Sequence, residues 1–135
     1  MPINKINHPA VLTAAVVYFL LGRIWYDALA PRWLVVSHSP TAAMHSQDPG
    51  PLVISIAMAL MMTYATAIVL TRIPNGLVRG AQVGAFIGIA FVASGMLVAN
   101  LFEARPVAFW LVDAGYPVVG LTIAGAIVGG WKRHE

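Results

Sequence analysis

Residues 51–72 read PLVISIAMALMMTYATAIVLTR, an apolar run whose first charge is its last residue, Arg72. At a rise of 1.5 Å per residue, a helix of about 20 residues crosses the roughly 30 Å hydrocarbon core of a bilayer. Three further stretches share this length and apolar character, at residues 9–28, 77–102 and 106–131. The sequence therefore predicts an all-α polytopic membrane protein, a bundle of four transmembrane helices.

The connections between these stretches indicate one membrane domain over residues 1–135. Turn-forming residues at 74–76 (PNG) and a charged link at 103–106 (EARP) make short connections on either side of the third stretch. Short links place consecutive helices beside each other in antiparallel pairs. The outer loop at residues 29–50 is longer, and its second half is rich in turn formers, so both a plain tether and a lid over a site stay open.

The composition excludes several classes of function. Hydrophobic residues make up 59% of the chain, and a net charge of +3 spread over a membrane protein is what orientation bias produces, so we expect the lipid bilayer and no nucleic acid as a partner. The chain has no cysteine, which removes disulfides, thiolate metal sites and thiol catalysis. The sequence contains no metalloprotease, phosphate-loop or nucleophile motif, and its histidines lie outside the span interiors. We therefore predict no enzymatic activity and no cofactor.

Methionines in the second stretch could belong to a metal-binding site or to ordinary helix packing. Met58, Met61 and Met62, with Met44 and His45 in the preceding loop, would suit a soft metal such as copper. Methionine is also an ordinary gap-filler in apolar helices. We favour this second interpretation and predict no metal site.

The distribution of basic residues predicts the orientation of the chain. Cytoplasmic segments of membrane proteins carry an excess of Lys and Arg. On the side of the two termini lie Lys5, Arg72, Arg79, Lys132 and Arg133; on the other lie Arg23, Arg32 and Arg105, accompanied by Asp27, Asp48 and Glu103. We expect both termini in the cytoplasm.

Glycines recur at helical spacing in the third and fourth stretches. The positions are Gly80, Gly84, Gly88 and Gly95 in the third, in a stripe that continues through Ala99 to Glu103, and Gly125 and Gly129 in the fourth. Small residues let helix backbones approach closely where lipid supplies no hydrophobic drive between helices. We predict that they pack the third helix against the fourth; a homodimer face is the alternative.

Asp113 is the most informative single residue, because it lies about seven positions, or roughly 10 Å, inside the fourth stretch. A carboxylate at this depth is costly unless it is paired, hydrated or protonated. Tyr116 follows on the same helix face. Pro117 removes the backbone hydrogen bond that the Asp113 carbonyl would otherwise accept.

We therefore expect an outer-facing polar pocket at the ends of the first, third and fourth stretches. Its residues are Arg23, Asn100, Glu103, Asp113 and Tyr116. Arg23 would pair with Asp113, unless it pairs with Asp27 one turn along its own helix. Such a pair is either a structural charge lock or part of a site for an ion, a proton or a polar ligand.

Three tyrosines, Tyr18, Tyr64 and Tyr116, fall near mid-depth. Hydroxyl partners are available at Thr63, Thr66 and Ser94. Buried phenols usually find a hydrogen-bond partner. The tyrosines either extend a polar track inward from Asp113 or bond across helices, and we favour the second.

Residues 22–26 (GRIWY), 101–106 (LFEARP) and 113–116 (DAGY) form a recognisable pattern. In these motifs the chain resembles a bacterial family of small four-span membrane proteins, domain of unknown function one-seven-six-one. The resemblance implies an integral protein of the bacterial inner membrane and no particular activity. It also implies that Asp113 and Pro117 depart from the family pattern, in which asparagine is more usual at position 113.

Two hypotheses from different classes follow. The leading one is an oligomeric permease or a polar-ligand or ion-binding protein that uses the predicted pocket, in two or more copies because one bundle is small for a pathway. The alternative is an accessory subunit of a larger membrane complex, with Arg23 and Asp113 as an assembly lock. A third, an enzyme acting on a lipid or quinone, would place an amphiphile beside Asp113 and Tyr116.

Overall fold

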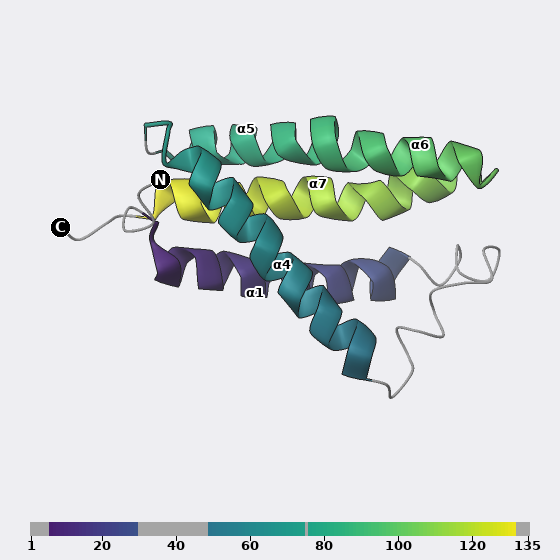
Figure 1. Cartoon of the computed structure of the whole chain (residues 1–135), viewed down its shortest axis with the longest axis horizontal. Coiled ribbons are helices and arrows are strands. Elements are labelled where there is room, and N and C mark those ends of the chain that lie inside the picture. The colour runs from purple at the N-terminus through teal and green to yellow at the C-terminus, as the bar shows by residue number, and fades with distance from the viewer. Residues whose placement is uncertain (1–5, 30–48, 75, 132–135) are drawn as a thin grey trace.

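The computed structural model describes residues 6–29, 49–74 and 76–131, and this part of the chain forms four long helical spans (Figure 1). The first, second and fourth spans are α1 (His8–Leu29), α4 (Pro49–Leu70) and α7 (Val107–Gly130). The third span, Leu77–Phe102, consists of α5 (Leu77–Ile87), the π-helical segment η2 (Gly88–Ala93) and α6 (Ser94–Phe102). All four are long and apolar enough to cross a membrane, which confirms the predicted all-α four-span fold.

The outer surface of the bundle is apolar. Large hydrophobic side chains are exposed on every span, for example Val16, Ile54, Phe91 and Leu111. A water-soluble protein rarely exposes apolar surface on this scale, whereas hydrocarbon tails cover it at no cost. Helices also satisfy their own backbone hydrogen bonds, as the hydrocarbon interior requires.

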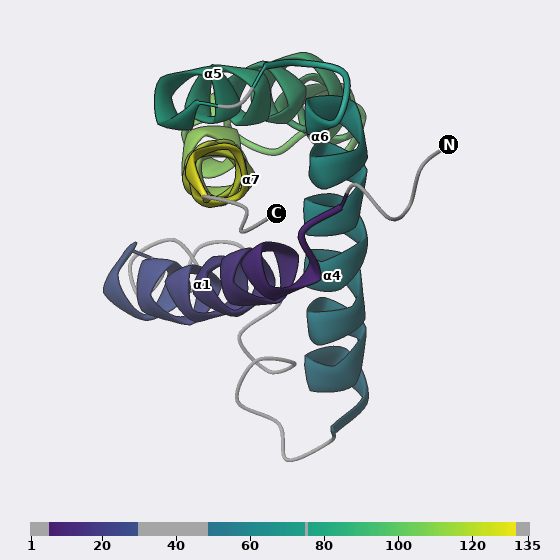
Figure 2. The same ribbon diagram turned by 90° about the vertical axis from the view of Figure 1, so that its left-hand side faces the viewer.

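The helix α7 lies at the centre of the molecule. Figures 1 and 2 show α1, α7 and the third span stacked side by side, with α4 crossing the stack obliquely on one side. The first and last spans therefore pack along each other, whereas the consecutive helices α4 and α5 meet near the turn that joins them. The expected pairing of consecutive neighbours holds for the third span and α7 but not for α4, because α4 is tilted away.

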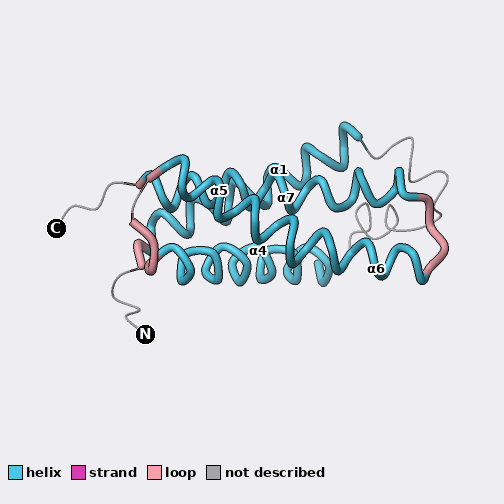
Figure 3. The backbone as a smooth tube through the Cα atoms, turned by 90° about the horizontal axis from the view of Figure 1, so that it is seen from above, coloured by secondary structure: helices cyan, strands magenta, loops and turns pink. Residues whose placement is uncertain are grey.

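The start of α1, the end of α7 and the turn between α4 and α5 share one end of the bundle (Figure 3). There the backbone N–H of Gly76 donates to the carbonyl oxygen of Gly129 at 2.9 Å. The turn between α6 and α7 lies at the opposite end. The predicted outer loop lies outside the described residues, apart from its first residue and its last two.

The third span and α7 approach each other through glycines. We name this contact the glycine interface, and it comprises Gly80, Gly84, Gly88, Gly125 and Gly129. A Cβ atom at Gly80 would overlap the carbonyl oxygen of Gly125, and one at Gly84 would overlap that of Leu121. The two backbones are in direct contact, so only glycine fits at these positions. These five predicted glycines thus pack the third helix against the fourth within one chain.

Gly95 is not part of this interface. It is exposed, and a Cβ atom there would meet nothing within 4 Å. Its assignment to helix packing is wrong because a π-helix adds a residue relative to the α-helical repeat, and one residue turns the rest of the span by about 100°. The buried residue near the end of the span is accordingly Asn100 and not Ala99. Trp110 Nε1 donates to the carbonyl oxygen of Ala93 at 2.9 Å and ties the end of η2 to α7.

Candidate functional site

An open cavity of about 330 Å³ lies between α1 and α4, with one residue of α7 in its wall. Its lining residues are Tyr18, Phe19, Gly22 and Arg23 of α1, Ile54, Ser55, Met58, Ala59 and Met62 of α4, and Tyr116 of α7. On α4 they recur every four residues from Ile54 to Met62, which is a length of about 12 Å along the helix. The volume falls at the lower end of the roughly 300–1,000 Å³ that is typical of small-molecule sites.

Two tyrosines connect the three helices around this cavity. The Tyr116 hydroxyl donates to the backbone carbonyl oxygen of Tyr18 at 2.8 Å, and the two ring centroids are 4.8 Å apart. The Tyr18 hydroxyl in turn donates to the Met62 sulfur at 3.7 Å, a weak hydrogen bond. One wall of the cavity therefore consists of two phenol rings and a thioether that are linked across the three helices.

Glycines also line the contact between α1 and α7, but here each one faces an aromatic ring. The pairs are Gly22 with Tyr116, Gly115 with Trp25 and Gly120 with Tyr18, where an added Cβ would lie 2.7, 2.8 and 2.6 Å from the ring. Trp25 Nε1 further donates to the carbonyl oxygen of Val112 at 2.8 Å. We name this contact the glycine–aromatic interface; it positions Tyr116 beside the cavity.

The structure places two of the five predicted pocket residues, Arg23 and Tyr116, at the same cavity. Asp113 is half-buried on α7 and is not among the lining residues. The described residues show no ion pair between Arg23 and Asp113. The cavity at which these two residues meet lies between α1 and α4 because α4 takes an oblique course across the stack.

Asn100 and Glu103 instead shape the turn from α6 to α7. The Asn100 side chain is buried and its Nδ2 donates to the carbonyl oxygens of Arg105 and Pro106 at 3.1 and 3.2 Å. The Glu103 carboxylate pairs with Arg105 Nε at 3.0 Å on the surface. Ala104, with φ of 56°, occupies the left-handed position of a Schellman motif. Both predicted ligand-binding residues thus serve local structure.

The other hydroxyl groups do not form a polar track. Tyr64 bonds to Nδ1 of His8 at 2.9 Å, near the opposite end of α1. Thr63 and Thr66 are buried and donate to carbonyl oxygens of their own helix, as does Ser94 in the third span. Tyr18 and Tyr64 therefore belong to separate bonds across helices.

The methionines divide between the cavity and the surface. Met58 and Met62 line the cavity, whereas Met61 is 60% exposed on another face of α4. Met44 and His45 lie outside the described residues. Within the described ranges, no group of three or more His, Asp or Glu side chains is found that could hold a metal ion.

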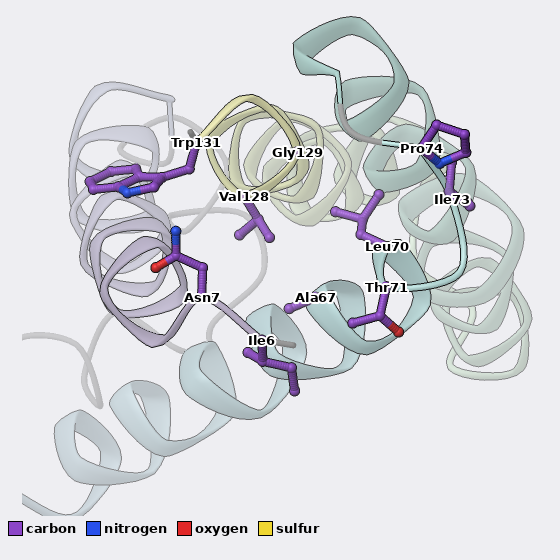
Figure 4. A pocket seen from close by; sticks show the side chains of 10 residues that line it. All are labelled: Ile6, Asn7, Ala67, Leu70, Thr71, Ile73, Pro74, Val128, Gly129 and Trp131. Atoms are coloured by element: carbon purple, nitrogen blue, oxygen red, sulfur yellow. The ribbon is translucent and has the colours of Figure 1, made fainter. Parts of the chain in front are cut away.

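A smaller hollow of about 100 Å³ lies at the end of the bundle that holds the start of α1 and the end of α7 (Figure 4). It is lined by Ile6, Asn7, Ala67, Leu70, Thr71, Ile73, Pro74, Val128, Gly129 and Trp131. Asn7 Oδ1 accepts the backbone N–H of Ala10 at 3.4 Å and so caps α1. No charged side chain appears among these lining residues, and the volume is small for a ligand.

The four apolar helices define an integral membrane protein. A family model described as protein of unknown function (DUF1761) matches residues 9–129, which is all of the four spans except their first and last residues, His8 and Gly130. The chain belongs to this family. None of the curated proteins and none of the solved structures matches the chain.

Proposed function

We propose that this protein is a non-enzymatic, oligomeric permease or ligand-binding protein whose ligand occupies the cavity between α1 and α4. The observation that carries the proposal is the cavity itself, in which Arg23, Ser55 and Tyr116 lie among mainly apolar side chains. Apolar walls with a few polar groups are typical of small-molecule sites. One copy surrounds the cavity with three helices, so transport through the membrane would need a second copy.

We further propose that the protein lies in a bacterial inner membrane with both termini in the cytoplasm. Arg72 and Arg79 support this orientation: they flank the turn between α4 (ending at Leu70) and α5 (beginning at Leu77), and this turn shares one end of the bundle with the start of α1 and the end of α7. The chain has no cysteine, so single cysteines can report the orientation. Ser46→Cys should react with an impermeant maleimide in intact cells, and Lys132→Cys only after lysis; the reverse pattern would contradict the proposal.

Native mass spectrometry after mild extraction from the source membrane tests the proposed function. The expected result is a species of two or more copies that carries a small molecule. Met58→Trp should remove the molecule by filling the cavity, whereas Met61→Trp, on the exposed surface of the same helix, should retain it. Equal retention by both variants would contradict a ligand site in the cavity.

An accessory subunit of a larger membrane complex is the second candidate. It is favoured by the exposed aromatic surface of the third span, where Phe86 and Phe91 stack edge to face at 6.3 Å. A stoichiometric foreign subunit in the same experiment would support it. Asp113→Asn distinguishes the two: loss of the foreign subunit supports the accessory role, whereas the molecule in the cavity should be unaffected because Asp113 does not line it.

A further inference from the structure

The lining of the cavity combines one charged side chain with a long apolar wall. Arg23 is the charged group among the described lining residues, and the large aliphatic and aromatic side chains of Phe19, Ile54, Met58 and Met62 line the cavity as well. Methionine side chains adapt to flexible apolar partners. A ligand that complements this lining has an anionic group at one end and a hydrocarbon chain behind it.

The depth of the lining residues fits a molecule that enters from the bilayer surface. Arg23 lies six residues before the end of α1, at about 9 Å, and Ile54 lies five residues after the start of α4, at about 8 Å. An arginine at this depth can extend its guanidinium to the headgroup level while its stem stays in apolar surroundings. From Ile54 the wall continues inward by about 12 Å to Met62.

The cavity is also open towards the lipid. Ile54 and Met58, two of its lining residues on α4, are 61% and 43% exposed. A ligand can therefore enter sideways from the membrane. A lipid already present in the bilayer satisfies this condition.

We infer that the ligand is an anionic phospholipid of the bilayer, whose phosphate group binds Arg23 and whose acyl chain lies along α4 past Met58 towards Met62. Guanidinium groups bind phosphate through two parallel hydrogen bonds, which favours arginine for this contact. The inference rests on the proposed function, since it assigns the ligand of the same cavity. Asp113 is not part of this lipid site.

The test is lipid retention from nanodiscs that contain equal amounts of phosphatidylglycerol and phosphatidylcholine with identical acyl chains, measured by native mass spectrometry. The wild type should retain phosphatidylglycerol about fivefold over phosphatidylcholine, the equivalent of about 1 kcal/mol for one basic side chain near an anionic surface. Arg23→Gln should retain lipid without this preference. Arg79→Gln, which removes an exposed arginine of α5, is the matched control and should keep it.

Two further outcomes separate this inference from the proposed function. If Arg23→Gln keeps the fivefold preference, or Arg79→Gln loses it equally, the phosphate contact is wrong, while the cavity remains a ligand site as long as Met58→Trp abolishes retention. If Met58→Trp retains as much lipid as Met61→Trp and the wild type, both the lipid assignment and the cavity as a binding site are wrong.

Discussion

The two faces of α7 use the same residue type for different purposes. Towards α5, glycines meet backbone, and at Gly84 there is no room even for a methyl group. Towards α1, glycines meet aromatic rings, and the hydroxyl of Tyr116 reaches across to the backbone of Tyr18. The first face is closed, whereas the second has a cavity of about 330 Å³ beside it.

The difference shows what holds this bundle together and where it can open. Helices in a membrane gain no hydrophobic drive from association, so close packing and hydrogen bonds between helices stabilise the fold. At the glycine interface the packing is so close that the two backbones touch directly. The glycine–aromatic interface leaves side-chain atoms between the backbones, and side chains can move where backbones cannot.

The largest expected effect is that of Gly84→Ala in the glycine interface. Its Cβ atom would overlap the backbone oxygen of Leu121, so α5 and α7 must separate, at a cost of about 3 kcal/mol in the free energy of unfolding. Denaturant titration in mixed micelles measures the change. Gly95→Ala in the same span is the control, and it should be neutral or stabilising by about 0.5–1 kcal/mol, because the site is open.

Gly22→Ala tests the glycine–aromatic interface on the other face of α7. It should lower the free energy of unfolding by about 1–2 kcal/mol, which is less than Gly84→Ala. The added methyl group would lie 2.7 Å from the tip of the Tyr116 ring, which can shift into the adjoining cavity. The same titration compares it with Gly84→Ala. If the two substitutions cost the same, the side-chain contact is as rigid as the backbone contact and the comparison fails.

Tyr116→Phe removes the hydroxyl group that bonds across the glycine–aromatic interface. It removes the donor to the Tyr18 carbonyl and keeps the ring, so we expect a loss of about 1 kcal/mol in unfolding free energy. Tyr64→Phe, which removes the exposed bond to His8, should cost less. An equal loss in both variants would show that burial of the Tyr116 hydrogen bond does not increase its contribution to the free energy of unfolding.

The smallest effect lies outside both faces, in the turn from α6 to α7. Ala104 has a positive φ that glycine adopts without strain, so Ala104→Gly should stabilise the protein by about 0.5–1 kcal/mol. A thermal unfolding curve measures this as a rise in midpoint. A fall would mean that the gain in flexibility of the unfolded chain outweighs the relief of backbone strain.

Hydropathy alone predicted the four spans, because length and apolar character are dictated by the bilayer and do not depend on which helices touch. Glycine spacing likewise predicted Gly80, Gly84 and Gly88, since α-helical periodicity holds up to the first residue of η2. Beyond Gly88 the prediction failed at Gly95, because nothing in the residues of η2 marks a π-helix as distinct from an α-helix.

The candidate site was predicted only in part, for a related reason. Arg23 and Tyr116 belong to the cavity, but among the α4 side chains that complete it, Met58 and Met62 were interpreted from the sequence only as gap-fillers of an apolar helix. The tilt of α4 that turns them into a wall is a tertiary property. Asn100 and Glu103 were assigned to a pocket because they are polar, although the backbone carbonyls and Arg105 of the nearest turn satisfy them first.

The extra residue in η2 shifts by one the positions of the third span that face α7. Before it, one set of positions faces α7; after it, the set one place further along does so, as the burial of Asn100 shows. In a relative one residue shorter within Gly88–Ala93, the segment can close as plain α-helix, and the position of Asn100 keeps its place at the turn. A relative whose span has the same length but is plain α-helix would instead present the positions of Gly95 and Ala99 to α7 and need small residues there, while the glycine positions before η2 stay as they are.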